Sequence, residues 1–458
     1  MRTNHMRAVA WALCLAGCGG DPLGPPANGS PGPMEREECP SDRGTLTGTL
    51  ARSCRLTADR TWRLRGQVSV PAGVTLTIEP GTVVQGQYGM PVSFLLVERG
   101  GRLLAEGTAE RPIVFTSERP PGERAPGDWG GVVLKGRAHL NLPGGEGELE
   151  GEAGRYGGGA TPDDNDSSGV LRYVRIEFAG RVISGENELN ALTLGAVGRG
   201  TRIEYVQVHQ ALDDGFEMFG GSVDLRYCVA TAMQDDAFDW DFGWTGRGQF
   251  LVAQQIVGDG NNGIEADNNK DNNDLMPLSS PTLYNVTLVG TGRGQQAMKQ
   301  PRFGLTLRRG TAGRLHNLIV TGFQDAGMVM TEDSTARRTV DGQLDITHSL
   351  FYGNGTTDER NIYDPQQARL PRDPQAPTKP FDLRAWVLAK ERMNREADPM
   401  LRNPLDVRAP DFRPQTGSPA LQGARQPPAD GFFTPVDYIG AVGPQQDWTR
   451  GWTAYPVN

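Results

Sequence analysis

The stretch that decides the fold is Asp-Asp-Gly-Phe-Glu at residues 213–217, which returns as Asp-Asp-Ala-Phe-Asp at 235–239 and as Asn-Asn-Gly-Ile-Glu at 261–265. Each copy follows a short run of strand-forming residues such as Leu225–Ala230. Self-similarity at this spacing indicates a repeat protein, in which each unit buries its apolar face against the next unit.

Equivalent apolar positions set the period of this repeat. They recur 24, 22, 26, 41 and 23 residues apart, at Leu192, Phe216, Phe238, Ile264, Leu305 and Met328. Steps of this length are too short for the common helical repeats or for a propeller blade, and they match one turn of a β-solenoid. The longest step carries polar insertions at 268–280 and 291–302, so we expect one coil with loops hanging from it.

Alternation within each copy assigns residues to the two faces of a strand, because side chains point to opposite sides with period two. Phe216 and Met218 fall on one side, as do their equivalents in the other coils, and this side is the predicted core. The other side projects five carboxylates outward from three consecutive coils: Glu217, Asp239, Glu265, Asp241 and Asp267.

The repulsion between these stacked carboxylates should be offset by a positively charged partner. Neighbouring coils stack about 4.8 Å apart, so like charges in one column repel by about 1 kcal/mol per contact even in water. With the adjacent turn residues they form a candidate calcium site, since calcium prefers several carboxylate and carbonyl oxygens. The candidate ligands are Asp213, Asp214, Glu217, Asp235, Asp236, Asp239, Asp241, Glu265 and Asp267.

Two other interpretations of the same residues stay open. In one, the turn Asp and Asn side chains cap backbone groups and form ladders that hold the coils in register, while the strand face is solvated. In the other, the face is catalytic or binds a sugar. The loop motifs at 163–169 and 267–274 fail the EF-hand pattern, and we expect both to be solvated loops.

Composition and charge narrow the function classes. The 458 residues include 61 Gly and 33 Pro, which suits tight turns and short strands. The formal net charge is −9, which argues against a nucleic-acid partner and against electrostatic adhesion to anionic lipid. After the N-terminal segment, no apolar run reaches the roughly 20 residues of a membrane helix.

The N-terminal segment has the pattern of an export signal. Arg2 and Arg7 precede a short apolar stretch that ends in Leu-Ala-Gly-Cys at 15–18. This tetrapeptide resembles the bacterial lipobox, which implies cleavage after residue 17 and a lipid anchor on Cys18. We therefore expect a lipoprotein of the cell envelope that is sorted to the outer membrane. Its signal sequence also permits display at the cell surface. In an oxidising compartment Cys39 and Cys54 are expected to pair, and Cys228 to be a buried thiol.

The chain divides into four segments that differ in composition and in predicted secondary structure. We predict a signal peptide at 1–17, a Pro/Gly tether and N-terminal cap at 18–61, the solenoid at 62–355 and a C-terminal cap region at 356–458. An amphipathic helix is predicted over 383–396 with Asp382 as its N-cap, and it would close the open end of the stack.

Several segments of the chain resemble motifs of a known protein family. The motif Thr-Leu-Thr-Ile-Glu-Pro-Gly-Thr at 75–82, the repeat at 235–239 and the elements at 410–414, 417–421 and 447–453 resemble a family of bacterial surface and secreted proteins. The resemblance spans about 62–458 and implies a right-handed parallel β-helix. It implies no settled activity.

The leading functional hypothesis is a non-enzymatic, lipid-anchored surface protein that binds a glycan, a matrix component or an envelope protein. The alternative is a calcium-dependent polysaccharide lyase or a glycoside hydrolase. Gln-Asp-Asp at 234–236 resembles the paired aspartates of polygalacturonase-like hydrolases, but the Gly-His-Gly and Arg-x-Lys elements of that family are missing. Candidate bases of a lyase lie on one coil: Lys270, Lys299, Arg302 and Arg308.

Overall fold

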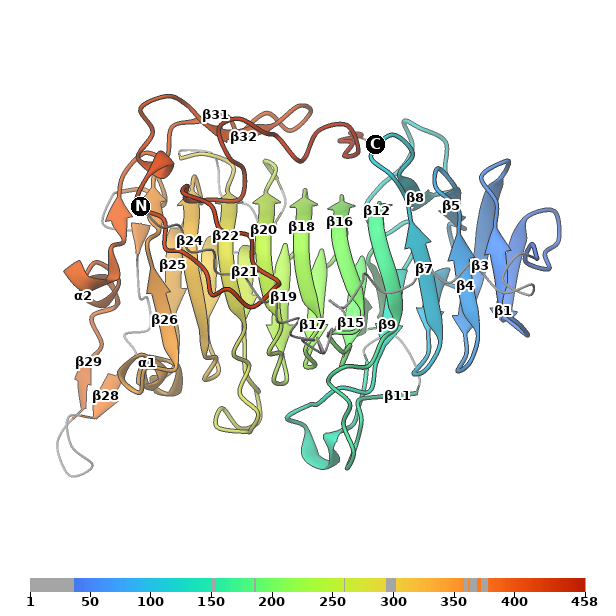
Figure 1. Ribbon diagram of the computed structural model, residues 1–458, viewed down its shortest axis with the longest axis horizontal. Helices are drawn as coiled ribbons and strands as arrows, with labels where there is room; N and C mark the ends of the chain where they lie inside the picture. The colour runs from blue at the N-terminus through green and yellow to red at the C-terminus, as the bar shows by residue number, and fades with distance from the viewer. Residues whose placement is uncertain are drawn as a thin grey trace, which may run out of the picture.

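The computed structural model describes residues 37–149, 154–184, 187–258, 260–293, 302–357, 361–362, 369–371 and 378–457. Their strands stack in parallel, coil upon coil, as a right-handed parallel β-helix (Figure 1). The stack begins with seven strands: β1 (Thr45–Thr49), β2 (Cys54–Leu56), β3 (Thr61–Val70), β4 (Thr75–Ile78), β5 (Val83–Gly86), β7 (Arg102–Glu106) and β8 (Ile113–Ser117).

Long strands form two of the three sheets of the central coils. They are β12 (Gly169–Glu177), β16 (Arg202–His209), β18 (Asp224–Thr231), β20 (Arg247–Gln254), β22 (Thr282–Val289) and β24 (Gly313–Thr321). Each of them bends at one residue with positive φ, for example Tyr205 at 54°. The two halves of β12 pair separately with β7 and β8, so the bend divides each long strand between two sheets.

Short strands form the third sheet: β6 (Phe94–Val97), β9 (Gly131–Lys135), β15 (Leu192–Gly195), β17 (Phe216–Phe219), β19 (Phe238–Asp241), β21 (Asn262–Ala266), β23 (Phe303–Leu307) and β25 (Ala326–Met330). Phe216 is in register with Phe238, and Ile264 with Leu305. All four are at most 1% exposed. The predicted repeat register and core face are therefore confirmed.

The last coils are formed by β26 (Leu344–Thr347), β27 (Leu350–Tyr352) and β30 (Arg395–Glu396). Four antiparallel pairs of strands lie outside the parallel sheet: β10 (Gly147–Glu148) with β11 (Arg155–Tyr156), β13 (Arg181–Ser184) with β14 (Asn187–Leu189), β28 (Arg369–Pro371) with β29 (Thr378–Pro380), and β31 (Leu401–Asn403) with β32 (Asp411–Pro414).

The helical content differs from expectation. Helix α2 (Leu383–Val387) begins at the predicted N-cap, where Asp382 accepts a hydrogen bond from the Ala385 N–H at 2.9 Å. Its predicted extension to residue 396 is wrong, because Asn394 binds the Val387 carbonyl and the chain then enters β30. Helix α1 (Asp333–Val340) was not predicted, since Ala336 and Val340 are the only apolar residues in its sequence.

Residues 397–457 form a segment that we call the C-terminal strap. It runs back along the outside of the coils, from the end near α2 toward β12 (Figure 1). Side-chain amides of the coils hold its backbone: Gln207 donates to the Ala454 carbonyl at 2.7 Å and Asn285 to the Tyr438 carbonyl at 2.8 Å. The strap buries Trp452 and Phe412 against Val229 and Val252 of the sheet. It therefore covers one side of the solenoid.

The N-terminal end of the stack is closed by a disulfide between Cys39 and Cys54, and the Cys39 N–H also donates to the Arg55 carbonyl at 3.0 Å. Cys228 is a free, fully buried thiol whose pKa is raised by burial. Cys18 lies outside the described residues. No helix in the described part of the chain is long and apolar enough to span a membrane.

Candidate metal centre

A ladder of turn side chains lies just before the short strands β15, β17, β19 and β21. Asn190 accepts the backbone N–H of Asp214 at 3.3 Å, Asp214 accepts that of Asp236 at 2.9 Å, and Asp236 accepts that of Asn262 at 2.6 Å. Each bond uses the Oδ1 atom and joins one coil to the next. The backbone-capping ladder considered for the turn residues is therefore present, and it leaves the second oxygen of each carboxylate for other contacts.

Beside the ladder, Glu217, Asp239 and Glu265 occupy one register position on β17, β19 and β21. The outer members have nearby partners: Glu217 accepts a hydrogen bond from Asn190, and Glu265 accepts one from Asn262 at 3.2 Å. The Oδ1 atom of Asp239, between them, is buried and has no hydrogen-bond partner among the described residues. A buried carboxylate oxygen in this state is expected to take a proton or a cation.

Ladder and column bring the carboxylates into three overlapping groups. In each group, one oxygen per residue lies within 4.8 Å of the others, and the groups share Asp214 and Asp239. Oxygen donors at this spacing suit a hard divalent cation such as calcium. The groups are Asp213 with Asp214 and Asp235, Asp214 with Glu217 and Asp239, and Asp236 with Asp239 and Glu265.

Electrostatics at the centre of these groups favours a bound cation. Burial raises the pKa of Asp239 well above the usual carboxyl range, and the charges of Glu265 and Glu217 raise it further. Burial likewise raises the pKa of Asp214 and Asp236, with neighbouring carboxylates adding to the effect. The pKa of Glu265 rises to about 7, because burial outweighs the opposing charge of Arg308. A divalent cation would replace the protons that these groups otherwise retain.

Two arginines close the C-terminal side of the cluster. Arg308 binds Glu265 through Nη2 and Asp267 through Nε, the latter at 2.8 Å, and Arg309 binds the other oxygen of Asp267 at 2.7 Å. Both oxygens of Asp267 are thus occupied, and this residue lies outside the three groups, as does Asp241. Seven of the nine candidate ligands are brought together.

Of the four residues predicted as candidate lyase bases, those that the structure describes lie in different environments. Burial alone would lower the pKa of Arg308, but Asp267 and Glu265 raise it above its ordinary value, so the guanidinium holds its proton. Arg302 is 1% exposed and Lys270 is exposed in the loop after β21. Lys299 lies outside the described residues. Arg308 is therefore an ion-pair partner of the cluster and unsuited to act as a base.

Sequence reasoning missed Asn190 and Arg309 as parts of the site. Asn190 lies 24 residues before Asp214, which is the period of the repeat, and this spacing was the available signal. Arg309 follows Arg308 directly, but strand alternation places neighbours on opposite faces. Arg309 has a positive φ of 50°, so it lies in a turn beyond the strand, where that rule ends.

The two loop motifs are solvated in part, as expected, since Asp163 and Asp271 are exposed, but each motif also holds a buried residue that fastens its loop to the coils. Asp166 is 5% exposed and accepts the Arg137 N–H at 2.9 Å. Asn268 is fully buried and accepts hydrogen bonds from Asn141 and from the Ser279 N–H, both at 2.8 Å. These contacts fasten loops to the coils with protein partners.

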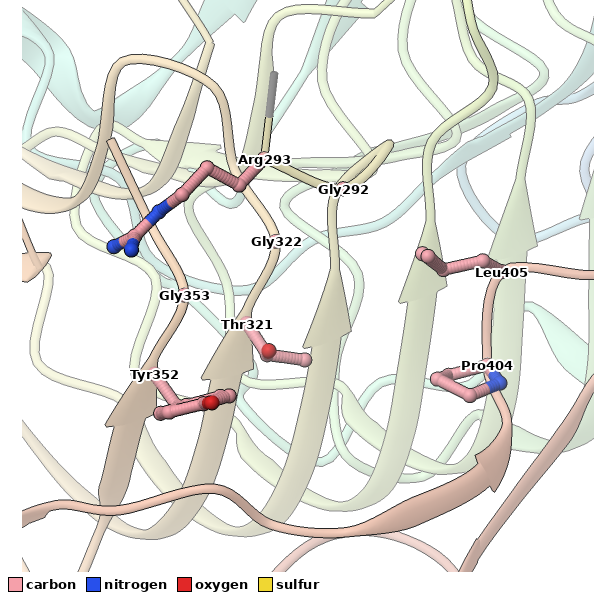
Figure 2. A pocket seen from close by; sticks show the side chains of 8 residues that line it. All are labelled: Gly292, Arg293, Thr321, Gly322, Tyr352, Gly353, Pro404 and Leu405. Atoms are coloured by element: carbon pink, nitrogen blue, oxygen red, sulfur yellow. The ribbon is translucent and has the colours of Figure 1, made fainter. Parts of the chain in front are cut away.

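A separate hollow of about 390 Å³ lies between the coil corners and the strap. Figure 2 shows Arg293 and Tyr352 on one side of it, with Pro404 and Leu405 on the other. The Arg293 guanidinium donates to the carbonyls of Gly355 and Asn354, at 3.0 and 3.1 Å. None of the described residues that line this hollow belongs to the carboxylate groups.

Comparison with known proteins agrees with this architecture. Residues 48–375 match the family described as pectate-lyase like beta helix domain. Neither a curated protein nor a solved structure matches the chain.

Proposed function

The chain belongs to the pectate-lyase-like β-helix domain family, and we propose that it is a calcium-loaded glycan-binding protein of the cell envelope. The supporting observation is the buried Asp239 Oδ1 atom, which has no hydrogen-bond partner in the described part of the chain, together with the membership of Asp239 in two of the three carboxylate groups. Calcium would satisfy this atom and neutralise the column. The family contributes the fold and leaves the activity open.

Asp214, Glu217, Asp236, Asp239 and Glu265 would hold the cation. Bound calcium supplies an electropositive point to which sugar oxygens, above all a uronic-acid carboxylate, can be attracted. The chain's own residues do the rest: the turn ladder fixes the spacing of the coils, and Arg308 neutralises the end of the cluster. An acidic polysaccharide is therefore the proposed ligand class at this face.

Binding is favoured over cleavage because, among the described residues, the one candidate base placed against the cluster is unsuited to that role. A lyase needs a deprotonated base near the metal, whereas Arg308 is held charged by two carboxylates. A polysaccharide-cleaving enzyme remains the second candidate. Asp239 and Glu265 favour it, since Glu265, whose pKa is raised to about 7, lies beside a second carboxyl group, and such a pair can serve as acid and base.

Location at the envelope rests on the N-terminal sequence. Cleavage before Cys18 and lipidation of its thiol would leave residues 19–36 as a Pro/Gly-rich spacer between the membrane and the solenoid. The negative net charge of the chain suits a partner reached through a cation better than nucleic acid or an anionic membrane.

The test is to incubate the full mature chain with polygalacturonate and alginate, in calcium and in chelator, and to measure both binding and new reducing or unsaturated ends. We expect calcium-dependent binding without new chain ends, and loss of binding in Asp239→Asn. Asp271→Asn makes the same charge change in an exposed loop and serves as the control. Cleavage that disappears in Asp239→Asn would establish the enzymatic alternative.

A further inference from the structure

Aromatic rings form a continuous stack at the bend between the two sheets of the long strands. Tyr173 stacks on Tyr205 with ring centroids 4.5 Å apart, Tyr205 on Tyr227 at 4.4 Å, and Tyr227 on Phe250 at 4.9 Å. All four residues have a positive φ, between 50° and 60°. The same bend in each coil therefore presents a ring at the same corner, and the stack runs along the outside of the solenoid.

The strap lies over the edge of this stack. Trp448 meets Tyr227 edge-on at 5.2 Å and Tyr205 at 6.4 Å, and its indole N–H donates to the Ala441 carbonyl at 2.8 Å. The Tyr438 carbonyl is held by Asn285, the residue that follows Phe250 in the column of bends. The strap thus brings Trp448 and Tyr438 next to the ring stack, and hydrogen bonds hold both of these strap residues in place.

Between the stack and the strap lies an open cavity of about 490 Å³, which we call the aromatic pocket. Its apolar wall is formed by Tyr205, Tyr227, Phe250, Tyr438 and Trp448. This volume falls within the range of pockets that bind small molecules. Phe250 is almost fully buried, while the tyrosines and Trp448 are half-buried and line the opening.

The polar part of the lining is uncharged or acidic. Asp437, Gln445 and Gln446 are exposed at the rim and supply carboxylate and amide groups. Among the described residues that line the pocket, none is Lys, Arg or His. Burial raises the pKa of Tyr438 to about 12, with Tyr227 adding to the effect, so its hydroxyl keeps its proton and can donate as well as accept.

We propose that the aromatic pocket binds an uncharged sugar residue of a glycan. A sugar ring has apolar C–H faces that pack against aromatic rings, and hydroxyls that pair with amide and carboxylate groups. The lining offers both kinds of contact. A uronic acid is disfavoured here, because its carboxylate would meet Asp437 without a cation. The site uses no residue of the carboxylate cluster, so it stands whether or not the chain binds calcium.

The experiment is calorimetric titration of the full mature chain with cellohexaose, mannohexaose, chitohexaose, hexagalacturonate and a hexaproline peptide. At least one neutral hexasaccharide is expected to bind. The triple variant Asp437→Ala, Gln445→Ala, Gln446→Ala changes exposed residues and should weaken that binding at least tenfold, or about 1.4 kcal/mol. Trp448→Phe should weaken it as well, through lost ring area.

Two matched control variants test whether the sugar binds at the aromatic pocket. Tyr173→Phe changes a ring of the same stack that does not line the pocket, and it should leave the affinity unchanged. Asp239→Asn should also leave it unchanged, which separates this site from the proposed calcium site. Three results would overturn the proposal: no neutral hexasaccharide binds, hexagalacturonate or hexaproline alone binds, or the triple variant binds as well as the native chain.

Discussion

Asp239 and Glu265 lie side by side on adjacent strands, yet their carboxylates have different partners. Glu265 is bound by Arg308 and Asn262, whereas the Asp239 Oδ1 atom is buried without a hydrogen-bond partner in the described structure. An oxygen that is unpaired among the described residues therefore lies at the centre of the cluster, on Asp239 between Glu217 and Glu265. A cation there would satisfy this oxygen, and several measurable consequences arise from this arrangement.

Asp239→Asn is expected to change thermal stability in opposite directions with and without calcium. In chelator the variant should melt at a higher temperature than the native chain, because a buried carboxyl among like charges is removed. Calcium at about 100 times its Kd should stabilise the native chain by about 2.7 kcal/mol and the variant by much less. Calorimetric melting of both chains, with Asp271→Asn as control, checks this. Equal melting shifts in calcium would contradict it.

Stability in chelator is expected to fall as the pH rises from about 4.5 to about 7. The pKa of Glu265 is raised from 4.5 to about 7 in the folded state, so its contribution is fully present below pH 4.5 and is lost as the pH passes 7. Asp214, Asp236 and Asp239 shift in the same direction. Urea unfolding across this range measures the slope. A flat or rising profile in chelator would show that the carboxyls are not protonated in the folded state.

Arg308→Ala is expected to destabilise the chain by about 3 kcal/mol in chelator, because it leaves the buried Glu265 without its ion-pair partner and Asp267 with Arg309 alone. Excess calcium should recover part of this loss, since a cation can serve the same carboxylates. Arg337→Ala removes an exposed pair with Asp274 and is the control, with an effect within about 1 kcal/mol. Denaturant unfolding compares them, and similar losses in both variants would be evidence against a charged cluster.

His209 is expected to report whether the end of the strap is in place. It is 3% exposed, its Nε2 atom lies 2.8 Å from the Pro456 carbonyl, and burial lowers its pKa to about 4. The stability that it contributes is present above its unfolded pKa of 6.5 and is lost as the pH falls toward 4. Ending the chain at residue 453 should return its pKa to near 6.5, as measured by NMR titration. An unchanged pKa would mean that the strap does not bury it.

Cys18→Ser is expected to move the expressed protein from the detergent-rich to the aqueous phase in a Triton X-114 partition, because the lipid anchor is lost. Cys14→Ser alters a residue that cleavage would remove, so it should partition like the native chain. A native chain found in the aqueous phase would exclude the lipid anchor.

The register and the core of the solenoid could be predicted because the repeat carries that information locally. Phe216, Phe238 and Ile264 recur at one coil length, and parallel stacking then places Glu217, Asp239 and Glu265 together. Periodicity does not describe contacts between distant segments. His209 is buried because residues 454–457 return to a strand almost 250 positions earlier. The aromatic pocket depends on the same return of the strap.

The environment of the carboxylates could be predicted only in part. Alternation correctly separated them from the core, but it suggested a solvated face, whereas Glu265 is 8% and Asp267 3% exposed. Their burial comes from the turn ladder and from Arg308 and Arg309, which lie 41 or more residues further along the chain. The register of Ile264 with Leu305 aligns Arg308 with Asp267 across the long insertion between β21 and β23, whereas Arg309 lies in the turn beyond β23, where strand alternation no longer applies.

The most direct test of the central claim is calorimetric titration of the full mature chain with calcium at pH 7.5, after removal of bound metal by chelator. We predict saturable calcium binding, release of protons on binding, and at least a tenfold weaker affinity in Asp239→Asn but not in Asp271→Asn. Absence of calcium binding, or binding that Asp239→Asn leaves unchanged, would contradict it.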